Sequence, residues 1–284
     1  MLNNFDRFSL VNDILPFIKD YTNKLFVIKY GGSAMQDNSL QFNVINDISF
    51  LHFLGIKIVL VHGGGPSINT WLSKLNIKPR FENGIRLTDS QTMEVVEMVL
   101  SGKINKHLVS LFNKNNILSV GLSGKDANLT LSSPLFLNSN NLVGHIDLIN
   151  NNVLNLLLSN NYVPVISSIS CDLNQDTYNI NADTFAGSIA ESLAADKLIL
   201  LTDTLGVMQN LNVPSSLIKN LKIDDISSLR EECIISGGMI PKVECCVKAV
   251  KHGVKSAHII DGRIPHSLLY ELLTLDRIGS KITV

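Results

Sequence analysis

Six short, continuously apolar runs recur along the 284-residue chain, and helical patterns fill the stretches between them. Because the runs are continuous rather than alternating, each predicts a strand that is buried on both faces. Strands of this kind, alternating with helices, predict an α/β fold with a mainly parallel sheet and right-handed crossovers. The six runs cover residues 25–30, 56–62, 117–122, 163–169, 197–202 and 257–261.

Several positions indicate where helices begin. Pro66 follows three glycines and suits the first turn of a helix. Thr88 followed by Gln91 predicts a capping box at the start of another helix. Asp183 precedes an apolar stretch over residues 184–195, and it is a good N-cap for the helix expected there.

Two segments lie outside this alternation of strands and helices. The Asn-rich segment over residues 137–161 predicts a projecting β element, with a hairpin-like stretch at residues 150–152. Residues 1–22 predict a separate N-terminal helix that Pro16 would kink. Its apolar face needs a partner, either its own domain or another subunit; that face consists of Phe8, Val11, Leu15 and Ile18.

Composition excludes several classes of protein. The net charge is −1 and aromatic residues make up 6% of the chain, so no nucleic-acid-binding surface is expected. The apolar runs are too short to cross a membrane, and the N-terminal stretch resembles neither a signal peptide nor a transit peptide. Heavy use of Asn, Ile, Leu and Lys is typical of an AT-rich genome. We therefore expect a soluble protein, in the plastid stroma if plastid-encoded and otherwise in the bacterial cytoplasm.

Cysteine and histidine usage gives no sign of disulfides or metal ligands. The cysteines contain no Cys-x-x-Cys pair, so reduced, buried thiols are expected. The seven histidines show no metal-ligand spacing, and we expect no metal site built from protein side chains alone. The four cysteines are Cys171, Cys233, Cys245 and Cys246.

Glycines and small polar residues follow several of the predicted strands. Ligands of open parallel sheets bind outside the carboxyl ends of the strands, so these loops are candidate binding loops. Two glycine loops could offer backbone N–H groups to anions, or they could be tight turns. Neither matches the P-loop or the dinucleotide motif. The loops cover residues 29–33, 62–66, 121–126, 179–183, 202–206 and 236–242.

Three charged residues and one charged pair each have two interpretations. Lys29 ends an apolar strand, where it either extends to solvent or aims a point charge at phosphoryl oxygens. Asp183 either caps a helix or holds two lysine ammonium groups in place. Arg86 is either a surface arginine or a carboxylate clamp. Lys125 and Asp126 are either a solvated turn pair or part of a site. Phosphoryl transfer needs mainly positioning and charge neutralisation, which two lysines and a nucleotide-bound Mg²⁺ would supply.

Seven short motifs follow one another in a fixed order and spacing. They are Lys-Tyr-Gly-Gly, Val-His-Gly-Gly-Gly-Pro, Asn-Gly-Ile-Arg, Gly-Leu-Ser-Gly-Lys-Asp, Tyr-Asn-Ile-Asn-Ala-Asp, Leu-Thr-Asp and Ser-Gly-Gly-Met-Ile-Pro-Lys. From about residue 24 to the C-terminus, the chain resembles the amino-acid kinase family, and within it the branch that phosphorylates N-acetyl-L-glutamate. The resemblance implies an open αβα sandwich and a single domain over residues 1–284. Its two lobes would be residues 24–195 for the substrate and residues 196–284 for the nucleotide.

The same resemblance implies an activity and its residues. The expected reaction is ATP-dependent phosphorylation of the γ-carboxylate of N-acetyl-L-glutamate, the second step of arginine biosynthesis, with Mg²⁺ bound through the nucleotide. The catalytic residues would be Lys29 and Lys242, organised by Asp183. The substrate-binding residues would be Gly64, Gly65, Arg86 and Asn179. The nucleotide-binding residues would be Gly31, Gly32, Thr202, Asp203, Gly206 and Gly238.

Regulation is implied by similarity to arginine-sensitive members. In those, a kinked N-terminal helix interlaces dimers into a hexamer, and His266, Glu271 and Gly279 match positions near the L-arginine effector site. The P-II signalling protein is a further partner of plastid and cyanobacterial members. The chain departs from the family pattern at Ala127, where glycine is usual, and in the segment over residues 275–280.

Other functions remain open on the sequence alone. Glutamate 5-kinase, aspartokinase and carbamate kinase share the same scaffold, although Arg86 and Asn179 favour N-acetylglutamate. A non-catalytic nucleotide-sensing module would lack the lysines, which are present. A dehydrogenase would need a dinucleotide fingerprint after the first strand, and none is found there.

Overall fold

The computed structural model describes residues 4–82, 85–136 and 140–284, with side chains from residue 12 onward. An eight-stranded sheet runs through the molecule in the order β12-β14-β13-β11-β1-β2-β8-β5. Neighbours from β13 to β5 are parallel, and β14 is antiparallel to β13. The strands are β1 (Leu25–Tyr30), β2 (Lys57–His62), β5 (Ser119–Ser123), β8 (Val163–Ser167), β11 (Lys197–Thr202), β12 (Asn220–Lys222), β13 (Ser256–Asp261) and β14 (Ser280–Thr283).

All six apolar runs form strands of this sheet, as predicted. Each of β2, β8 and β13 is buried almost throughout, because helices cover both sides of the sheet. The run over residues 163–169 breaks after Ser167, and β9 (Ile169–Cys171) joins a second sheet. The predicted α/β class with a mainly parallel sheet is confirmed.

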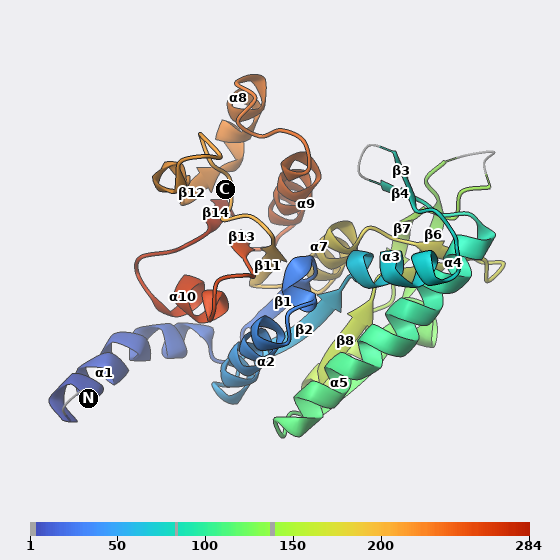
Figure 1. Cartoon of the computed structure of the whole chain (residues 1–284). Helices are drawn as coiled ribbons and strands as arrows, with labels where there is room; N and C mark the ends of the chain where they lie inside the picture. Colours follow the sequence, from blue (N-terminus) through green and yellow to red (C-terminus); the bar gives the residue numbers. More distant parts are fainter. Residues whose placement is uncertain (1–3, 83–84, 137–139) are drawn as a thin grey trace.

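Helices form a layer on each face of the large sheet (Figure 1). One layer contains α2 (Asn38–Phe53), α3 (Gly65–Lys74), α4 (Ser90–Glu97), α5 (Asn105–Lys114) and α10 (Ser267–Leu273). A π-helical stretch, Met98–Ile104, joins α4 to α5. The other layer contains α6 (Asn152–Ser159), α7 (Ala182–Ser192) and α9 (Met239–Lys251).

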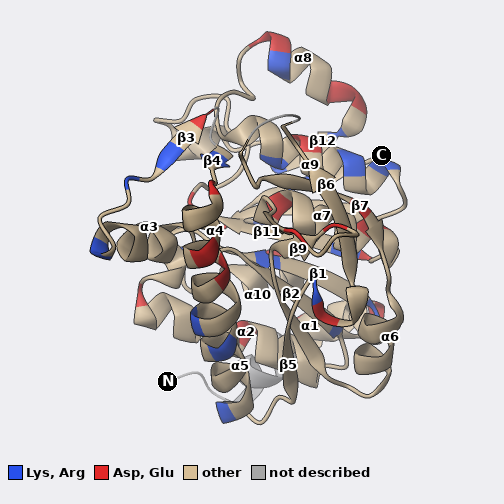
Figure 2. Cartoon of the chain, turned by 90° about the vertical axis from the view of Figure 1, so that its right-hand side faces the viewer, with Lys and Arg blue, Asp and Glu red and all other residues tan. Residues whose placement is uncertain are grey.

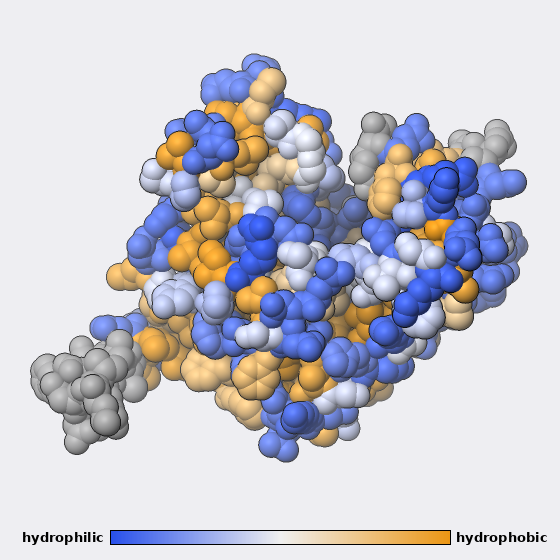
Figure 3. All heavy atoms as spheres, viewed as in Figure 1, coloured by the Kyte–Doolittle hydropathy of each residue, from blue (hydrophilic) through white to orange (hydrophobic). Residues whose placement is uncertain are grey.

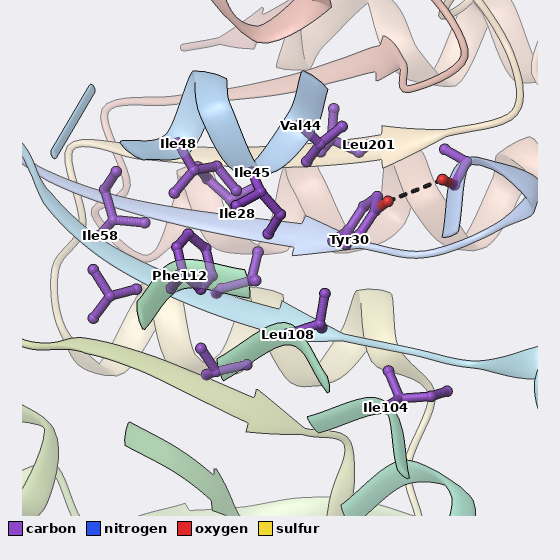
Figure 4. Packing of buried hydrophobic residues seen from close by; sticks show 14 of the residues in the cluster. Ile28, Tyr30, Val44, Ile45, Ile48, Ile58, Ile104, Leu108, Phe112 and Leu201 are labelled. Carbon is purple, nitrogen blue, oxygen red and sulfur yellow. Dashed lines mark hydrogen bonds between the residues drawn. The ribbon is translucent and has the colours of Figure 1, made fainter. Parts of the chain in front are cut away.

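Side chains of β1 alternate between the two cores. Phe26, Ile28 and Tyr30 pack beneath the α2 layer, and Val27 packs beneath the α7 and α9 layer. Figure 4 shows Ile28 and Tyr30 facing Val44 and Ile45 of α2, and the Tyr30 hydroxyl donates to the carbonyl of Ala34 at 2.9 Å. The centre of the sheet is therefore fixed from both sides, and the end of β1 is a rigid platform.

A second, smaller sheet and a short hairpin project beyond the carboxyl ends of the strands. The second sheet has the order β10-β9-β6-β7, and β3 pairs with β4. The predicted hairpin at residues 150–152 is wrong, because β7 ends at Ile149 and α6 begins at Asn152. The β element precedes that point, and residues 137–139 lie outside the described residues. Its strands are β3 (Arg80–Glu82), β4 (Ile85–Leu87), β6 (Thr130–Pro134), β7 (Gly144–Ile149) and β10 (Thr177–Asn179).

Two predicted helix caps are wrong by one or two positions. Asp89 caps α4 by accepting from the amide of Thr92 at 2.9 Å. The Thr88 hydroxyl instead donates to the carbonyl of Arg86. Asn181 caps α7 through the amides of Asp183 and Thr184. Since Asn181 satisfies these amides, the Asp183 carboxylate is free to point elsewhere.

The N-terminal helix α1 (Asn4–Tyr21) extends away from the body of the molecule, with Pro16 inside it. Ile14, Phe17 and Tyr21 pack on its own domain, while Leu15 is exposed. Phe8 and Val11 lie outside the described side chains, so the first half of the predicted apolar face stays a prediction. Among the described residues, no helix has both the length and the apolar character to cross a membrane.

The predicted lobes share one continuous sheet. The boundary near residue 195 falls between the end of α7 and the start of β11. Strands β11 to β14 come from the second lobe, and β11 pairs directly with β1 of the first. Figure 2 shows acidic and basic residues mixed on α8 (Ile226–Glu231) in the second lobe. The division into substrate and nucleotide lobes stays a prediction.

Candidate active site

The carboxyl end of β1 lies where the strand order reverses. From β1 the chain continues to β2 on one side, and it later returns through β11 on the other. Open α/β sheets bind ligands in the crevice formed at such a reversal. A cavity of about 290 Å³ lies here, and Figure 3 shows the molecule hollowed between α8 and the hairpin β3–β4. The predicted residues that line the cavity are Lys29, Gly31, Gly32, Gly64, Gly65, Arg86, Asn179 and Asp183.

One buried carboxylate holds two lysines at the cavity. Lys29 Nζ lies 2.9 Å from Asp183 Oδ1, and Lys242 Nζ lies 2.6 Å from Asp183 Oδ2. Lys29 ends β1, Asp183 is in the first turn of α7, and Lys242 is in the first turn of α9. The structure therefore brings together three residues that are far apart in sequence, in the arrangement that the motifs predicted.

The electrostatics of this cluster favour an ionised carboxylate. Asp183 is 6% exposed, and burial alone would raise its pKa. The two lysines outweigh burial and lower the pKa of Asp183 to about 2. One negative charge facing two positive charges leaves a net positive cluster, which can attract an anionic group such as a phosphate.

At several glycines next to this cluster, an added side chain would collide with a neighbouring residue. A Cβ on Gly31 would lie 2.8 Å from Lys29 Nζ, and a Cβ on Gly32 would lie 2.4 Å from Asp203 Oδ1. Gly32 also has a φ of 80°, which favours glycine. A Cβ on Gly64 would lie 2.3 Å from Ile104 Cδ1, whereas Gly65 faces open space. The loops let backbone approach the cavity closely, as an anion site requires.

Arg86 is a buried guanidinium with unused donor capacity. Its Nη2 donates to Asn69 Oδ1 at 2.7 Å, and its plane lies over the ring of Phe81. Its Nη1 is buried without a hydrogen-bond partner in the described part of the chain. Burial lowers the pKa of Arg86. Such a donor at a cavity wall is suited to a ligand carboxylate, so the surface interpretation of Arg86 is wrong.

Asn179 lies beside Arg86 through a chain of hydrogen bonds. The Asn179 amide donates to the Thr88 hydroxyl at 3.1 Å, and that hydroxyl donates to the carbonyl of Arg86. Sequence reasoning missed Asn69 and Phe81. Asn69 lies one helical turn after Gly65, so its position on the helix face could have revealed it. Nothing in the local sequence marks Phe81.

Of the residues predicted to bind nucleotide, Gly31 and Gly32 line this cavity. Four others do not: Thr202, Asp203, Gly206 and Gly238. Asp203 follows β11 and accepts from the amide and hydroxyl of Ser33, at 3.0 and 2.9 Å. The Thr202 hydroxyl bonds the backbone of Thr204, and Gly206 lies against Ser280. Gly238 directly precedes α9. Within the described ranges, no three His, Cys, Asp or Glu side chains gather as metal ligands would.

The residues matched to an effector site separate into two places. Glu271 Oε2 accepts from the amides of Ile278 and Gly279, and its Oε1 lies 2.7 Å from His258 Nδ1. His266 instead bonds Asp47 of α2 at 2.7 Å. Glu271 and Gly279 are therefore in direct contact, and His266, which directly precedes α10, is held elsewhere by Asp47.

Lys125 and Asp126 lie in a turn, where Lys125 is half-buried and Asp126 is exposed, and each bonds other residues. Lys125 Nζ bonds Glu97 at 2.9 Å and Thr177 at 3.0 Å. Asp126 accepts from the amide and hydroxyl of Ser123. Ala127, where the family usually has glycine, has a left-handed φ of 51°. The departure from the family pattern therefore carries a backbone cost.

A three-layer α/β fold with two lysines joined by one aspartate at the switch point is the arrangement expected of a phosphoryl-transfer enzyme. The model of the amino acid kinase family matches residues 24–261, and the chain belongs to that family. Curated relatives that match this chain over its full length are kinases, and so this chain is also a kinase.

Three comparisons illustrate the similarity. The chain is 54% identical to an acetylglutamate kinase of Gracilaria tenuistipitata var. liui, over 100% of both chains. It is 49% identical to an acetylglutamate kinase of Thermosynechococcus vestitus, over 99% of this chain and 96% of the relative. Its fold matches a solved N-acetylglutamate synthase from Neisseria gonorrhoeae with a TM-score of 0.85 and 22% identity. That match covers 97% of this chain and 63% of the synthase chain.

Proposed function

We propose that this enzyme transfers the γ-phosphoryl group of ATP to the γ-carboxylate of N-acetyl-L-glutamate, giving N-acetyl-L-glutamyl 5-phosphate in the second step of arginine biosynthesis. The observation that carries this proposal is a cavity lined by Arg86 and by Lys29 and Asp183 of the Lys29–Asp183–Lys242 cluster. Among the described residues, Nη1 of Arg86 has no hydrogen-bond partner there. Full-length similarity to acetylglutamate kinases, at about half identical residues, supports the choice of substrate.

The reaction joins two anions, so its main barrier is electrostatic. A carboxylate oxygen of the substrate forms a bond to the γ-phosphorus, and the bond from that phosphorus to the β–γ bridging oxygen breaks. Lys29 and Lys242 stabilise negative charge on the transferred group. Asp183 holds both ammonium groups in place and limits their mutual repulsion. No general base is needed, because the attacking carboxylate is already ionised at neutral pH.

The substrate is fixed at the other end of the cavity. Arg86 pairs with the α-carboxylate through its free Nη1, and Asn179 bonds the acetamido group. The backbone of Gly64 and Gly65 provides donors at the start of α3, where a helix dipole favours an anion. The cavity lining and the burial of Arg86 support these four roles.

The nucleotide binds between the glycine loop that follows β1 and the loops of the second lobe. Gly31 and Gly32 offer amides to its phosphates, since no side chain fits there. The loop of Thr202, Asp203 and Gly206, together with Gly238, forms the rest of the nucleotide site. A nucleotide-bound Mg²⁺ would supply further neutralisation of phosphate charge. The family supports the use of ATP, and the carboxylate of Asp203 beside the glycine loop suits a cation.

A coupled ADP assay tests the acceptor directly. N-acetyl-L-glutamate should be phosphorylated faster than glutamate, aspartate or carbamate, and faster turnover of free glutamate would contradict the proposal. Arg86→Lys should raise the KM for N-acetyl-L-glutamate by about tenfold or more, because Lys lacks the paired donors of Arg. The KM for ATP should stay the same. Arg80→Lys, at an exposed arginine, is the matched control.

Regulation by L-arginine at the region of Glu271 and Gly279 is a second part of the proposal. The Lys197 ammonium lies 4.9 Å from the ring of Tyr21 in the last turn of α1. Burial, then Lys281 and Arg277, lower the pKa of Lys197 to about 8, and Glu271 opposes them. The end of α1 and Glu271 therefore belong to one electrostatic region, which supports a link between the N-terminal helix and an effector.

Deletion of residues 1–20 tests the assembly part of this proposal. Light scattering should show a hexamer that becomes a dimer, and inhibition by L-arginine should weaken. An unchanged mass on deletion would reject the hexamer. Binding of a purified P-II protein and location in a plastid stroma are further expectations, tested by co-purification with P-II and by fractionation of the source cells.

A further inference from the structure

Helices α7 and α9 carry two of the three charged residues of the catalytic cluster and lie side by side (Figure 1). Both helices begin at the cavity, with Asp183 and Lys242 in their first turns. They therefore run in the same direction, and any change in their separation moves Lys242 relative to Asp183.

The residues of α7 that contact α9 lie along one side of α7, and their partners lie along one side of α9. On α7 the contacting positions are four residues apart, and on α9 they are about three apart, which is a regular way for helix ridges to interlock. The pairs in order from the cavity are Asp183 with Lys242 at 2.6 Å, Gly187 against Cys245, and Glu191 with Lys248 at 3.7 Å and His252 at 2.5 Å.

The middle pair has no spare room. A Cβ on Gly187 would lie 2.5 Å from Cys245 Sγ, a distance that real Cβ atoms do not reach. Gly187 has ordinary helical backbone, so this close approach to α9 is what requires glycine here. The absent side chain at position 187 lets α9 approach α7 closely.

Cys245 also bonds the residue that organises the lysines. Its Sγ donates to the main-chain carbonyl of Asp183 at 3.0 Å. Burial, followed by the nearby Asp183 charge, raises the pKa of the Cys245 thiol to about 12. The thiol therefore keeps its proton and remains a donor over the range in which enzymes work. This bond fixes the first turn of α7 from α9, one helical turn beyond Lys242.

We infer that Gly187 and Cys245 are positioning residues for phosphoryl transfer, setting the separation of α7 and α9 and with it the place of Lys242 at the transferred group. The inference rests on the proposed roles of Lys242 and Asp183. Phosphoryl transfer depends on placement of charge, and a displacement of about 1 Å can cost about 10²-fold in rate.

Gly187→Ala is the direct test. The added methyl group meets Cys245 Sγ and pushes the helices apart, so kcat should fall by about 10-fold to 10²-fold. The KM values for ATP and for N-acetyl-L-glutamate should change by less than about twofold, because Gly187 and Cys245 belong to neither the predicted substrate site nor the predicted nucleotide site. Gly102→Ala is the matched control, since an added Cβ there has no neighbour within 4 Å. Its kcat should equal that of the wild type.

Rescue separates positioning from general damage. Cys245→Ala removes the sulfur that the new methyl group meets, so Gly187→Ala with Cys245→Ala should recover most of the lost kcat. Cys245→Ala alone loses only the bond to Asp183, and its kcat should fall less than that of Gly187→Ala. An unchanged kcat in Gly187→Ala overturns the inference, and so does a double variant no faster than that single variant.

If Gly187→Ala does not fold, a second variant still tests the inference. Cys245→Val places an extra methyl group against Gly187 from the α9 side, and its kcat should be well below that of Cys245→Ala at equal thermal stability. Equal kcat values in these two variants overturn the inference. If the proposed function is wrong, the wild type itself will not turn over N-acetyl-L-glutamate; the variants are then compared on the acceptor that it does use.

Discussion

Two buried carboxylates, on helices that cover opposite faces of the large sheet, have opposite surroundings. Asp183 and Glu271 are 6% and 2% exposed, and each lies beside basic side chains. Asp183 faces two lysines at a cavity, and those lysines retain donors for a ligand. Glu271 is enclosed by His258 and by the amides of Ile278 and Gly279, which satisfy both of its oxygens.

The difference shows what separates a reactive charge cluster from a structural one. Buried charge needs partners in either case. At Asp183 the partners are flexible lysines with spare hydrogen-bonding capacity, so the cluster can act on a third group. At Glu271 the partners are mostly backbone, so the carboxylate fixes the chain between α10 and β14. Activity should depend on the first cluster and stability on the second.

The largest expected effect is on activity. Lys29→Ala and Lys242→Ala should each lower kcat by about 10²-fold to 10³-fold, the scale of losing one preorganised charge stabiliser. Steady-state assays with saturating ATP and N-acetyl-L-glutamate measure this. Lys251→Ala, on the exposed side of α9, is the control and should keep the wild-type kcat. A wild-type kcat in either active-site variant would refute its catalytic role.

The second effect should fall on stability. Glu271→Ala leaves a buried histidine and two amides without their acceptor, which should lower the free energy of unfolding by about 3 kcal/mol. Urea denaturation measures it, with the exposed Glu231→Ala as control. The kcat without L-arginine should stay near that of the wild type. A large loss of kcat at unchanged stability would reverse the comparison.

The third effect is a pH dependence from His258. Burial lowers the pKa of His258 to about 4, below its unfolded value near 6.5. The unfolded chain then binds a proton that the folded chain does not. This group's contribution is therefore complete above pH 6.5, and stability is lost as pH falls from 6.5 towards 4, by about 1.4 kcal/mol per pH unit. Replacing His258 with Gln should reduce the slope by that amount.

The pH slope of the wild type is compared with that of the His258 variant because a second buried histidine, His62, also contributes to it. Burial also lowers the pKa of His62 to about 4, so it adds a similar slope in the wild type and in the His258 variant. Asp183, with a pKa of about 2, should contribute its slope only below about pH 4. A wild-type slope equal to that of His258→Gln would mean that His258 is charged and paired with Glu271.

The smallest expected effect is on stability, at a residue outside the Asp183 and Glu271 clusters. It gives a reference size for the effects expected at those clusters. Ala127→Gly should stabilise the protein by about 1 kcal/mol, because glycine adopts the left-handed conformation without strain. Thermal unfolding measures this, and kcat should not change. Ala127→Ser is the control and should bring no gain. A loss of stability in the glycine variant would show that Ala127 makes contacts that outweigh its strain.

Much of the fold could be predicted from local pattern. Continuous apolar runs predicted six of the eight strands of the large sheet, since a strand covered on both faces must be apolar throughout. The two short strands β12 and β14 have no such run and were missed. The caps were less certain, because Thr88, Asp89, Asn181 and Asp183 are all residue types that can cap, and only hydrogen-bond geometry selects among them. The hairpin placed at residues 150–152 failed for the same reason, since asparagine suits both turns and helix starts.

The sequence by itself determined the chemistry available to this protein: lysines at a strand end and a helix start, glycines where backbone must approach, and an arginine and an asparagine in separate loops. These depend on residue type and spacing, which can be recognised along the chain. Only the tertiary structure decided which charges meet. Asp183 joins Lys29 and Lys242, Glu271 joins His258, and Gly187 admits Cys245, because contacts between distant segments depend on how the helices pack across the sheet.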